Sequence, residues 1–341
     1  MKDHVNWAIM APGNIANSMA KAISEMAKTH DTIKPYAVAS RSKIRAENFA
    51  NQWGFVKSYG SYKQLYDDPN VDAVYVSNPH SLHYESVIAL LNSGKHVLCE
   101  KPAGCNVDQL VDMMSVANDN NLFFMEAMWT AYNPTLRKVK EYISKGKIGK
   151  ILNIDSKYCL RSVYNRENRL WNPNLAGGAL LDLGIYNIFF SMLMNNFKGI
   201  EFFTSNARFK NNVDAWTSVS MSFSNKVTAT FQCALDTTAD SPTHDAVIYG
   251  TKGYITIKNF FKAQEALVHM YTEEKGSDNE ITEAISIPFE INGYEYELLD
   301  ATNQIMKGHI ESKIYTHTDS IYLASVLSDI RQQLNFKYPF E

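Results

Sequence analysis

Short apolar runs alternate with amphipathic stretches over the first 125 residues. The runs that read as buried strands are residues 5–10, 36–40, 73–77, 96–100 and 122–126. The stretches between them with the 3.6-residue period of helices are residues 14–28, 43–53, 82–93 and 107–120. Such alternation predicts βαβ units and a parallel sheet covered on both faces. We therefore expect a doubly wound α/β domain over residues 1–125.

The pattern changes near residue 126, where longer strand-like runs follow one another directly. They are residues 150–160, 200–209, 215–223, 226–235, 244–250 and 253–260. A turn is expected at Ser224-Asn225-Lys226, because Asn tolerates the left-handed region. Helices are expected near 179–195, 294–308 and 318–334. Strands in series predict a large, mostly antiparallel, open-faced sheet in a second α/β domain over 126–341, whose C-terminal helix could pack back on the first domain. Apolar alternation in 215–235 predicts a homodimer formed through this sheet.

Composition narrows the class of protein. The chain has 341 residues, enough for two cores, with 45% hydrophobic residues and a formal net charge of −3. This charge gives no electrostatic footprint for nucleic acid. The four cysteines form no C-x-x-C pair, and we see neither a secretory signal nor an uninterrupted apolar run of membrane-spanning length. We expect a soluble cytoplasmic protein with no membrane partner.

The loop after the first apolar run resembles a dinucleotide-binding turn. The usual pattern is G-x-G-x-x-G/A, and here Ala11 to Ala16 reads A-P-G-N-I-A. Gly13 stands where a pyrophosphate must approach the backbone, and Asn14 and Ile15 begin the helix whose N–H groups would face it. The first glycine is replaced by Ala11, so an ordinary strand–turn–helix remains an alternative.

The end of the second strand bears on the choice of cofactor. An NAD-specific site places Asp or Glu there for the ribose 2′-hydroxyl. This chain has Ser40 and Arg41 instead, and a guanidinium suits a 2′-phosphate. We expect NADP to be preferred to NAD, the alternative being that Arg41 is a solvated loop residue.

The run "NPHSLHYESVIALLNSGKHVLCEKP" (78–102) carries the most specific signal. Together with "EAMWTAYNP" (126–134), "GKIG" (146–149) and "GGALLDLGIY" (177–186), it resembles the Gfo/Idh/MocA oxidoreductase family. The resemblance covers essentially the whole chain. It is greatest to the branch that contains dimeric dihydrodiol dehydrogenases and NADP-dependent D-xylose dehydrogenases. It implies a Rossmann domain followed by a substrate-binding and dimerisation domain.

The resemblance also implies roles for single residues. Lys101 would be the catalytic lysine that contacts substrate and nicotinamide, held by Glu100 and Pro102. The implied cofactor-lining residues are Asn78, Pro79, His80, His83 and Trp129. The branch usually has Arg two residues after that Trp, where this chain has Ala131, so the substrate stays open.

Several of these residues have a plainer reading. His80 and His83 are three apart, but no third ligand has a useful spacing, so we predict no metal site. His83 alone also fits a hydrogen-bonded histidine at a helix start.

Asp182 and Tyr186 are four residues apart, which places them one turn apart on one helix face. Many family members have D-x-x-x-H here, whereas this chain has D-x-x-x-Y. Tyr186 is the predicted acid/base, assisted by the charge of Lys101, with Asp182 orienting the substrate or the tyrosine. The alternative is a half-buried core tyrosine. Arg169, in the preceding polar loop, is a further candidate for substrate binding.

The sequence thus predicts an NADP-dependent oxidoreductase that transfers hydride to or from a sugar, a dihydrodiol or a dicarbonyl. Two alternatives stay open. One is a dinucleotide-sensing protein without turnover, although Lys101, Asp182 and Tyr186 are all present. The other is an inositol or sugar-phosphate dehydrogenase, for which D-x-x-x-H would match better.

Overall fold

A computed structural model describes residues 3–237, 244–271 and 280–341. The chain divides into two compact units: residues 1–129 with 290–324, and residues 130–289 with 325–341. Residues 290–324 therefore belong with the first unit, whereas the sequence assigned everything after residue 125 to the second domain. Hydrogen bonds from Trp7 to Thr302 (3.1 Å) and from Tyr315 to Glu126 (2.7 Å) show what ties this returning segment to the first unit.

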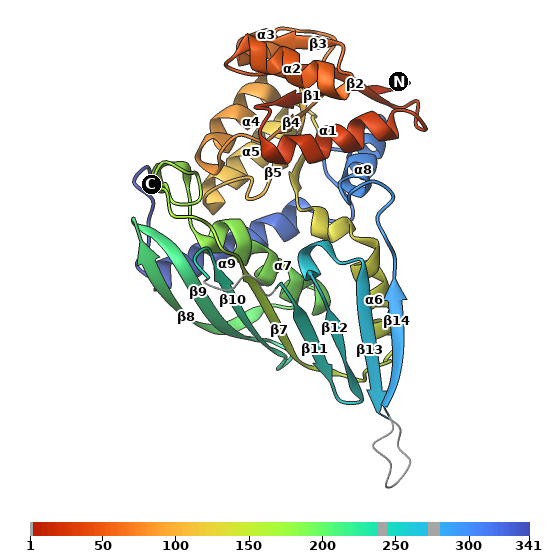
Figure 1. The fold of residues 1–341 in the computed structure, drawn as a ribbon, viewed down its shortest axis with the longest axis vertical. Helices are drawn as coiled ribbons and strands as arrows, with labels where there is room; N and C mark the ends of the chain where they lie inside the picture. Colours follow the sequence, from red (N-terminus) through yellow and green to blue (C-terminus); the bar gives the residue numbers. More distant parts are fainter. Residues whose placement is uncertain (1–2, 238–243, 272–279) are drawn as a thin grey trace. The chain divides into compact units, whose positions relative to one another are not determined.

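The first unit is a parallel six-stranded sheet in the order β3-β2-β1-β4-β5-β6 (Figure 1). Its strands are β1 (Val5–Met10), β2 (Ile33–Ala39), β3 (Lys57–Tyr59), β4 (Ala73–Val76), β5 (His96–Glu100) and β6 (Phe124–Ala127). Its helices are α1 (Asn14–Met26), α2 (Lys43–Trp53), α3 (Tyr62–Tyr66), α4 (His83–Asn92), α5 (Val107–Asp119) and α8 (Glu295–Met306), with a 3-10 turn, η1 (His80–Leu82). All four residues of β4 and of β6 are buried, as the sequence pattern of a parallel sheet covered on both faces requires. The predicted doubly wound domain is confirmed.

The second unit contains an eight-stranded sheet in the order β14-β13-β12-β11-β7-β10-β9-β8. Its strands are β7 (Ile151–Cys159), β8 (Ile200–Lys210), β9 (Val213–Phe223), β10 (Thr228–Ala234), β11 (Ala246–Gly250), β12 (Gly253–Ile257), β13 (Glu265–Tyr271) and β14 (Glu280–Ser286). Only β7 and β10 pair in parallel; the other neighbours are antiparallel. The predicted mostly antiparallel sheet is confirmed, and β13 and β14 extend it beyond the strands that the sequence indicated.

The remaining elements of the second unit are mostly helices. They are α6 (Pro134–Ser144), the short turns η3 (Pro173–Leu175) and η5 (Phe260–Lys262), the π-helical segment η4 (Leu180–Gly184), and α7 (Ile185–Met194). Two elements cross the division: η2 (Trp129–Tyr132) and α9 (His317–Gln333). The span Pro173–Met194 is apolar and long enough to cross a membrane by composition alone, with a hydropathy of 1.4. Residues 177–194 of this span are all buried, so the span belongs to the core of this unit.

Two local predictions differ from the structure. The helix expected over 179–195 begins as a π-helical segment before it becomes α-helical. In the turn after β9, the residue with positive φ is Lys226 (+67°), not Asn225. Asn225 instead exchanges side-chain hydrogen bonds with Asn195, at 3.2 and 2.8 Å.

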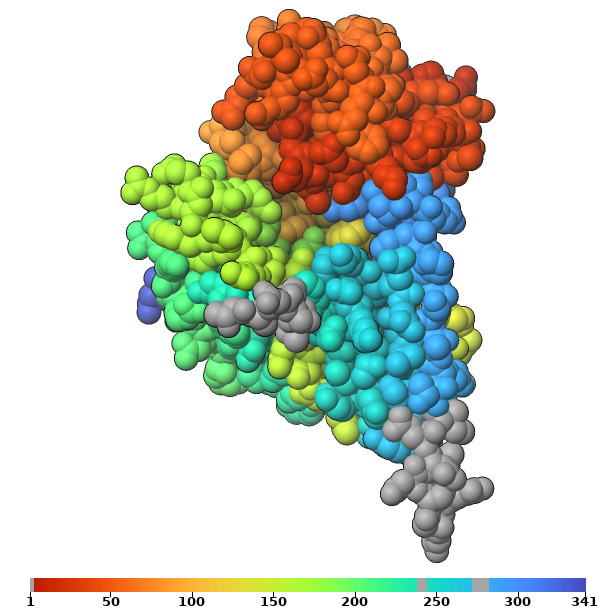
Figure 2. Space-filling model, in the orientation of Figure 1, coloured from red at the N-terminus to blue at the C-terminus, as the bar shows by residue number. Residues whose placement is uncertain are grey.

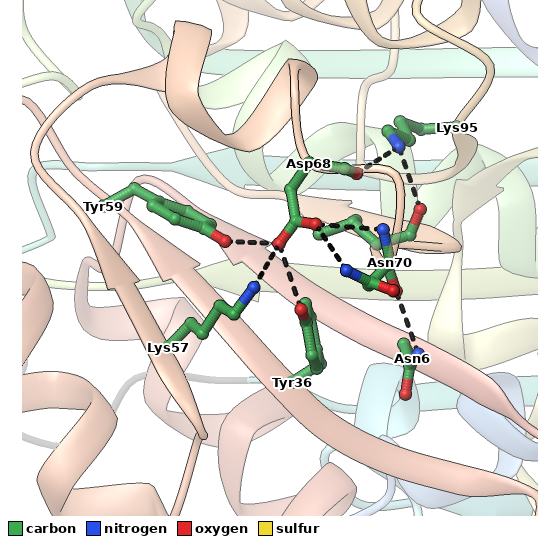
Figure 3. Close-up of polar contacts among 8 residues, drawn as sticks. Asn6, Tyr36, Lys57, Tyr59, Asp68, Asn70 and Lys95 are labelled. Carbon is green, nitrogen blue, oxygen red and sulfur yellow. Dashed lines mark hydrogen bonds and ion pairs between the residues drawn. The ribbon is translucent and has the colours of Figure 1, made fainter.

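The first unit also holds a dense polar cluster centred on the Asp68 carboxylate (Figure 3). The groups that donate to this carboxylate are the Tyr36 hydroxyl, the Tyr59 hydroxyl, the Lys57 ammonium, and the backbone and side-chain nitrogens of Asn70. Burial opposes ionisation, but these donors hold the pKa of Asp68 below its ordinary value. Because its donors come from β2, β3 and the segment before β4, we assign the cluster a structural role.

Candidate active site

The predicted cofactor residues follow neighbouring strands at the carboxyl edge of the parallel sheet. Ala11 follows β1, Ser40 follows β2, and Ser77 precedes Asn78 after β4. The Ala11 N–H donates to the Ala39 carbonyl at 3.0 Å, and the Ser77 hydroxyl donates to the Met10 carbonyl at 3.1 Å. Ligands bind at this edge in open α/β sheets.

The loop after β1 has the shape that a close-approaching anion requires. Ala11 has φ +67°, the left-handed region that glycine usually occupies. Gly13 has φ −109°, and a Cβ added there would meet nothing closer than the Ala11 carbonyl oxygen at 3.9 Å. The protein itself therefore does not require glycine at position 13. The missing side chain leaves room for a ligand.

The start of α1 offers uncapped N–H groups beside that space. Gly13 is the N-cap and supplies no side-chain acceptor, and the first turn contains no acidic residue. Gly13, Asn14 and Ile15 are all exposed. Uncapped N–H groups and the positive end of a helix dipole suit a pyrophosphate. These residues fit a dinucleotide.

The end of β2 carries a basic surface. Ser40 is buried, and its hydroxyl accepts the Ser42 N–H at 3.2 Å, while Arg41 is exposed. Burial raises the pKa of Tyr62, and the positive charges of Arg41 and Arg45 oppose that rise. Arg45, in the first turn of α2, was not identified from the sequence as part of this group.

The turn after β4 contains an unsatisfied acceptor. The Asn78 amide donates to the Ser86 hydroxyl at 2.8 Å and to the Leu82 carbonyl at 3.3 Å. Its Oδ1 is buried and has no hydrogen-bond partner within the described ranges. Pro79 is half-buried and His80 is buried beside it. A buried acceptor without a partner fits a donor supplied by a ligand.

The Glu-Lys-Pro turn after β5 is held from two sides. Glu100 accepts the Tyr75 hydroxyl and, through its other oxygen, the Lys101 N–H at 3.2 Å. Farther along, the Ala103 N–H donates to the Glu126 carboxylate at 2.9 Å. Glu100 and Lys101 are both 8% exposed, and the Lys101–Pro102 peptide bond is cis. The backbone that carries Lys101 is therefore fixed by two buried carboxylates.

His83 and Trp129 differ in their surroundings. The His83 ring is completely buried, with Nδ1 2.8 Å from the Pro102 carbonyl oxygen and Nε2 2.8 Å from the Asn78 carbonyl oxygen. Both ring nitrogens are thus used on the backbone, so His83 supports the cofactor-lining turn rather than lining it. The Trp129 ring stacks on Tyr294 with 4.6 Å between centroids.

In the second unit, Asp182 lies within the π-helical segment. Its carboxylate pairs with the Arg169 guanidinium at 3.0 Å, and its side chain is only 8% exposed. The start of the segment is held by Asp214, whose carboxylate accepts the Leu180 N–H at 2.7 Å. Gly178, at φ +121°, leaves the space that this carboxylate fills, since a Cβ there would lie 2.1 Å from Asp214 Oδ1. π-Helical turns are rare and frequent at functional sites.

Tyr186 lies among aromatic rings. Tyr158 and Phe261 are 5.9 and 5.5 Å from its ring by centroid, and they stack on each other at 4.2 Å. The His244 ring meets Tyr158 edge-on at 4.8 Å. Burial and the Asp182 charge raise the pKa of Tyr158. Tyr158, Phe261 and His244 were not identified from the sequence, because they come from β7, η5 and the residues before β11, far apart in the chain.

Comparisons with known proteins agree with this arrangement. Residues 5–128 match an oxidoreductase family described by an NAD-binding Rossmann fold, and residues 136–256 match the GFO/IDH/MocA C-terminal domain. The chain is 31% identical to trans-1,2-dihydrobenzene-1,2-diol dehydrogenase of Xenopus laevis, over 98% of this chain and 99% of that protein. The human enzyme of the same name is 28% identical, with 98% of each chain covered.

Two solved structures have the same fold. A 3-ketoreductase from Actinomadura kijaniata, in complex with NADP and TDP-benzene, gives a TM-score of 0.85 at 23% identity, covering 97% of this chain and 98% of that one. Levoglucosan dehydrogenase, in complex with NADH and levoglucosan, gives 0.85 at 19% identity, covering 97% of each chain. Of these two proteins of the same fold, one therefore binds NADP and the other binds NADH.

Proposed function

Because the chain belongs to the GFO/IDH/MocA oxidoreductase family, we propose that it is an NADP-preferring dehydrogenase or reductase of CH–OH and carbonyl groups. The observation that carries the proposal is a sheet edge whose residues fit a dinucleotide, with Lys101 at the same edge. Gly13 leaves space for a ligand, Asn78 offers a buried acceptor, and Lys101 follows β5 at the same edge.

The proposed chemistry divides between cofactor and protein. A bound nicotinamide supplies or accepts the hydride. Lys101 binds the reacting oxygen and favours its negative charge, and Tyr186 moves the proton at that oxygen. An ordinary tyrosine, with a pKa near 10, needs a nearby cation to do this at neutral pH, a charge that the ammonium of Lys101 supplies in this proposal. Asp182 and Arg169, paired in the structure, orient the substrate.

The proposed preference for NADP rests on the end of β2. Two arginines, Arg41 and Arg45, stand there with Ser40, and no carboxylate follows the strand. Arg41→Ala is expected to weaken NADPH binding about tenfold or more, because charge-assisted hydrogen bonds contribute about 1.5–3 kcal/mol, and to leave NADH binding nearly unchanged. Fluorescence titration with each cofactor measures this, with the exposed Lys28→Ala as control. Equal losses for both cofactors would remove Arg41 from the 2′-phosphate site.

The proposed substrates are polyhydroxylated rings or vicinal oxygen compounds. The relatives named above act on or bind a dihydrobenzenediol and levoglucosan, and the second unit presents stacked Tyr158 and Phe261 beside the Arg169–Asp182 pair. The test is reduction of NADP with aldoses, anhydrosugars and trans-dihydrodiols, against monohydric alcohols of equal size. Turnover confined to monohydric alcohols contradicts the proposed class.

Two alternatives predict different results in that screen. A dinucleotide sensor binds cofactor and turns over nothing. An inositol or sugar-phosphate dehydrogenase turns over those substrates best, although position 186 holds tyrosine rather than histidine.

We also propose a cytoplasmic homodimer formed through the second unit's sheet. The alternating apolar residues of β9 and β10 point inward, with Val219, Met221 and Phe231 buried, so they do not form the exposed surface expected from the sequence. Aromatic rings lie instead on β11, β12 and β13, where Tyr249 is exposed and Tyr254 and His269 are half-buried. Tyr249, Tyr254 and His269 are opposite one another in register. Atoms of β11–β13, cyan in Figure 2, form part of the surface seen in that view. Tyr254→Asp is expected to yield monomers in sedimentation experiments if this face pairs.

A further inference from the structure

The His83 side chain joins two turns of the first unit. The residue begins α4 and is fully buried. Its Nδ1 lies 2.8 Å from the Pro102 carbonyl oxygen, in the turn that carries Lys101. Its Nε2 lies 2.8 Å from the Asn78 carbonyl oxygen, in the turn after β4.

The chemistry of these two contacts fixes the protons on the ring. A carbonyl oxygen only accepts, and a neutral imidazole has a single N–H to donate. The nitrogen without a proton would direct its lone pair at a carbonyl oxygen 2.8 Å away, which is repulsive. We propose that His83 is an imidazolium at neutral pH and still at pH 8, and acts as a positioning residue, donating to both turns and thereby fixing the backbone that carries Lys101.

The titratable groups on the surrounding segments include His80, Tyr84, Glu85, Cys99, Glu100, Lys101 and Glu126. The His80 ring is edge-on to His83, with 5.7 Å between centroids. Glu100 and Glu126 accept backbone N–H groups on either side of Pro102, so carboxylates flank the turn to which His83 donates. The burial of the ring, the charge of Lys101 and the N-terminus of α4 oppose the imidazolium charge. Two carbonyl dipoles aimed at the ring and two carboxylates offset them, because hydrogen bonds to a charged donor are the stronger kind.

The consequence for catalysis rests on the proposed function. Loss of one His83 proton would release either the Pro102 carbonyl or the Asn78 carbonyl. The turn that carries Lys101 and the turn with the unsatisfied Asn78 acceptor would then no longer be held together. The expected result of His83→Gln, which donates to one carbonyl only, is a fall in kcat of at least tenfold. The surface variant His30→Gln should leave kcat unchanged.

The direct test is long-range ¹H–¹⁵N correlation of the histidine rings in the cofactor-free protein. The chain has nine histidines, and at pH 8 an exposed histidine is neutral, with one protonated and one unprotonated nitrogen. We expect one ring with both nitrogens protonated at pH 8, and its disappearance in His83→Gln but not in His30→Gln.

The outcomes separate this inference from the proposed function. If no ring of the wild-type protein carries both protons at pH 8, the inference is overturned, whether or not the variant folds. A spectrum of His83→Gln that keeps every doubly protonated ring of the wild-type protein overturns it as well. Absence of turnover in the wild-type protein contradicts the proposed function and leaves the spectrum of His83 to be judged by itself.

Discussion

The Asp214 carboxylate accepts the backbone N–H of Leu180 at 2.7 Å, and so holds the first turn of the segment that carries Asp182 and Tyr186. The same oxygen accepts the Thr217 hydroxyl at 2.7 Å, and Asp214 is completely buried. Burial raises its pKa to about 7, against the effect of these hydrogen bonds. A buried acid thus supports one end of the candidate catalytic helix.

This raised pKa predicts a dependence of stability on pH. The unfolded residue titrates near 3.9, so between about pH 4 and pH 7 the folded protein binds more protons than the unfolded chain. The free energy of unfolding therefore falls as pH rises through this window, by about 1–3 kcal/mol between pH 5 and pH 8, and then levels off. Asp214→Asn keeps an acceptor and removes the titration, so its denaturation midpoint should fall less over that range. Identical pH slopes for Asp214→Asn, wild type and the exposed control Asp31→Asn would contradict this assignment.

For the Asp68 cluster we expect the opposite dependence of stability on pH. Its donors hold the pKa of the folded carboxyl below the unfolded value, so its contribution is present above about pH 4 and is lost as pH falls further. Asp68→Asn turns a donor toward the Tyr36, Tyr59 and Lys57 groups. We expect it to cost about 2–3 kcal/mol at pH 7, measured by urea denaturation. Asp67→Asn is the matched control, because its ion pair with Lys63 is exposed and contributes little. Equal stabilities of the two variants would show that the cluster is not structural.

We expect replacement of Ala11 by glycine to stabilise the folded protein. With φ +67°, this alanine is in a conformation that disfavours a Cβ by about 1–2 kcal/mol. Ala11→Gly removes that strain from the folded protein. Because glycine also raises the entropy of the unfolded chain, the net increase in the free energy of unfolding should be about 0.5–1 kcal/mol. Ala16→Gly, the same change at a buried position inside α1, should instead lower stability by about 1 kcal/mol. Thermal denaturation compares them; a loss in both variants would mean that the loop is not strained at Ala11.

We expect a side chain at position 13 to weaken cofactor binding without changing the stability of the folded protein. A Cβ fits at this position in the protein alone, since its nearest contact would be 3.9 Å away. Gly13→Ala should therefore keep the wild-type denaturation midpoint within a degree or so, since surface changes alter stability little. It should nevertheless weaken NADPH binding by roughly tenfold or more, because the methyl group enters the space for the pyrophosphate. Unchanged NADPH affinity in a folded Gly13→Ala protein would place the cofactor elsewhere.

The parallel sheet and its strand ends were predictable because each depends on local pattern. Buried runs such as 73–77 are apolar throughout, and the Glu100-Lys101-Pro102 turn directly follows one of them. The strands β13 and β14 were not predictable in this way. Each begins with a glutamate, and β14 contains a second glutamate, Glu283. Such half-exposed strands lack a continuous apolar run.

Other features depended on packing between distant segments. The π-helical turn of Leu180–Gly184 lies where β10 approaches closely, since a Cβ on Gly184 would lie 2.9 Å from Cys233 Sγ. The Trp7 indole donates its hydrogen bond to Thr302, almost 300 residues away, and no hydrophobic periodicity in the sequence predicts such a pair. Likewise, His244 and Phe261 reach Tyr158 only through the pairing of strands.

The most direct test of the proposed acid/base role compares Tyr186→Phe with Tyr158→Phe in stopped-flow measurements of nicotinamide absorbance, using a substrate that the wild-type protein turns over. Both variants lose one hydroxyl from the same aromatic group. If Tyr186 is the acid/base, Tyr186→Phe loses turnover by a factor of about 10²–10⁴ while NADPH affinity stays within about twofold, since proton transfer is lost and binding is not. Tyr158→Phe should keep most of its turnover. Full turnover in Tyr186→Phe, with or without a loss in Tyr158→Phe, would contradict the proposed acid/base role.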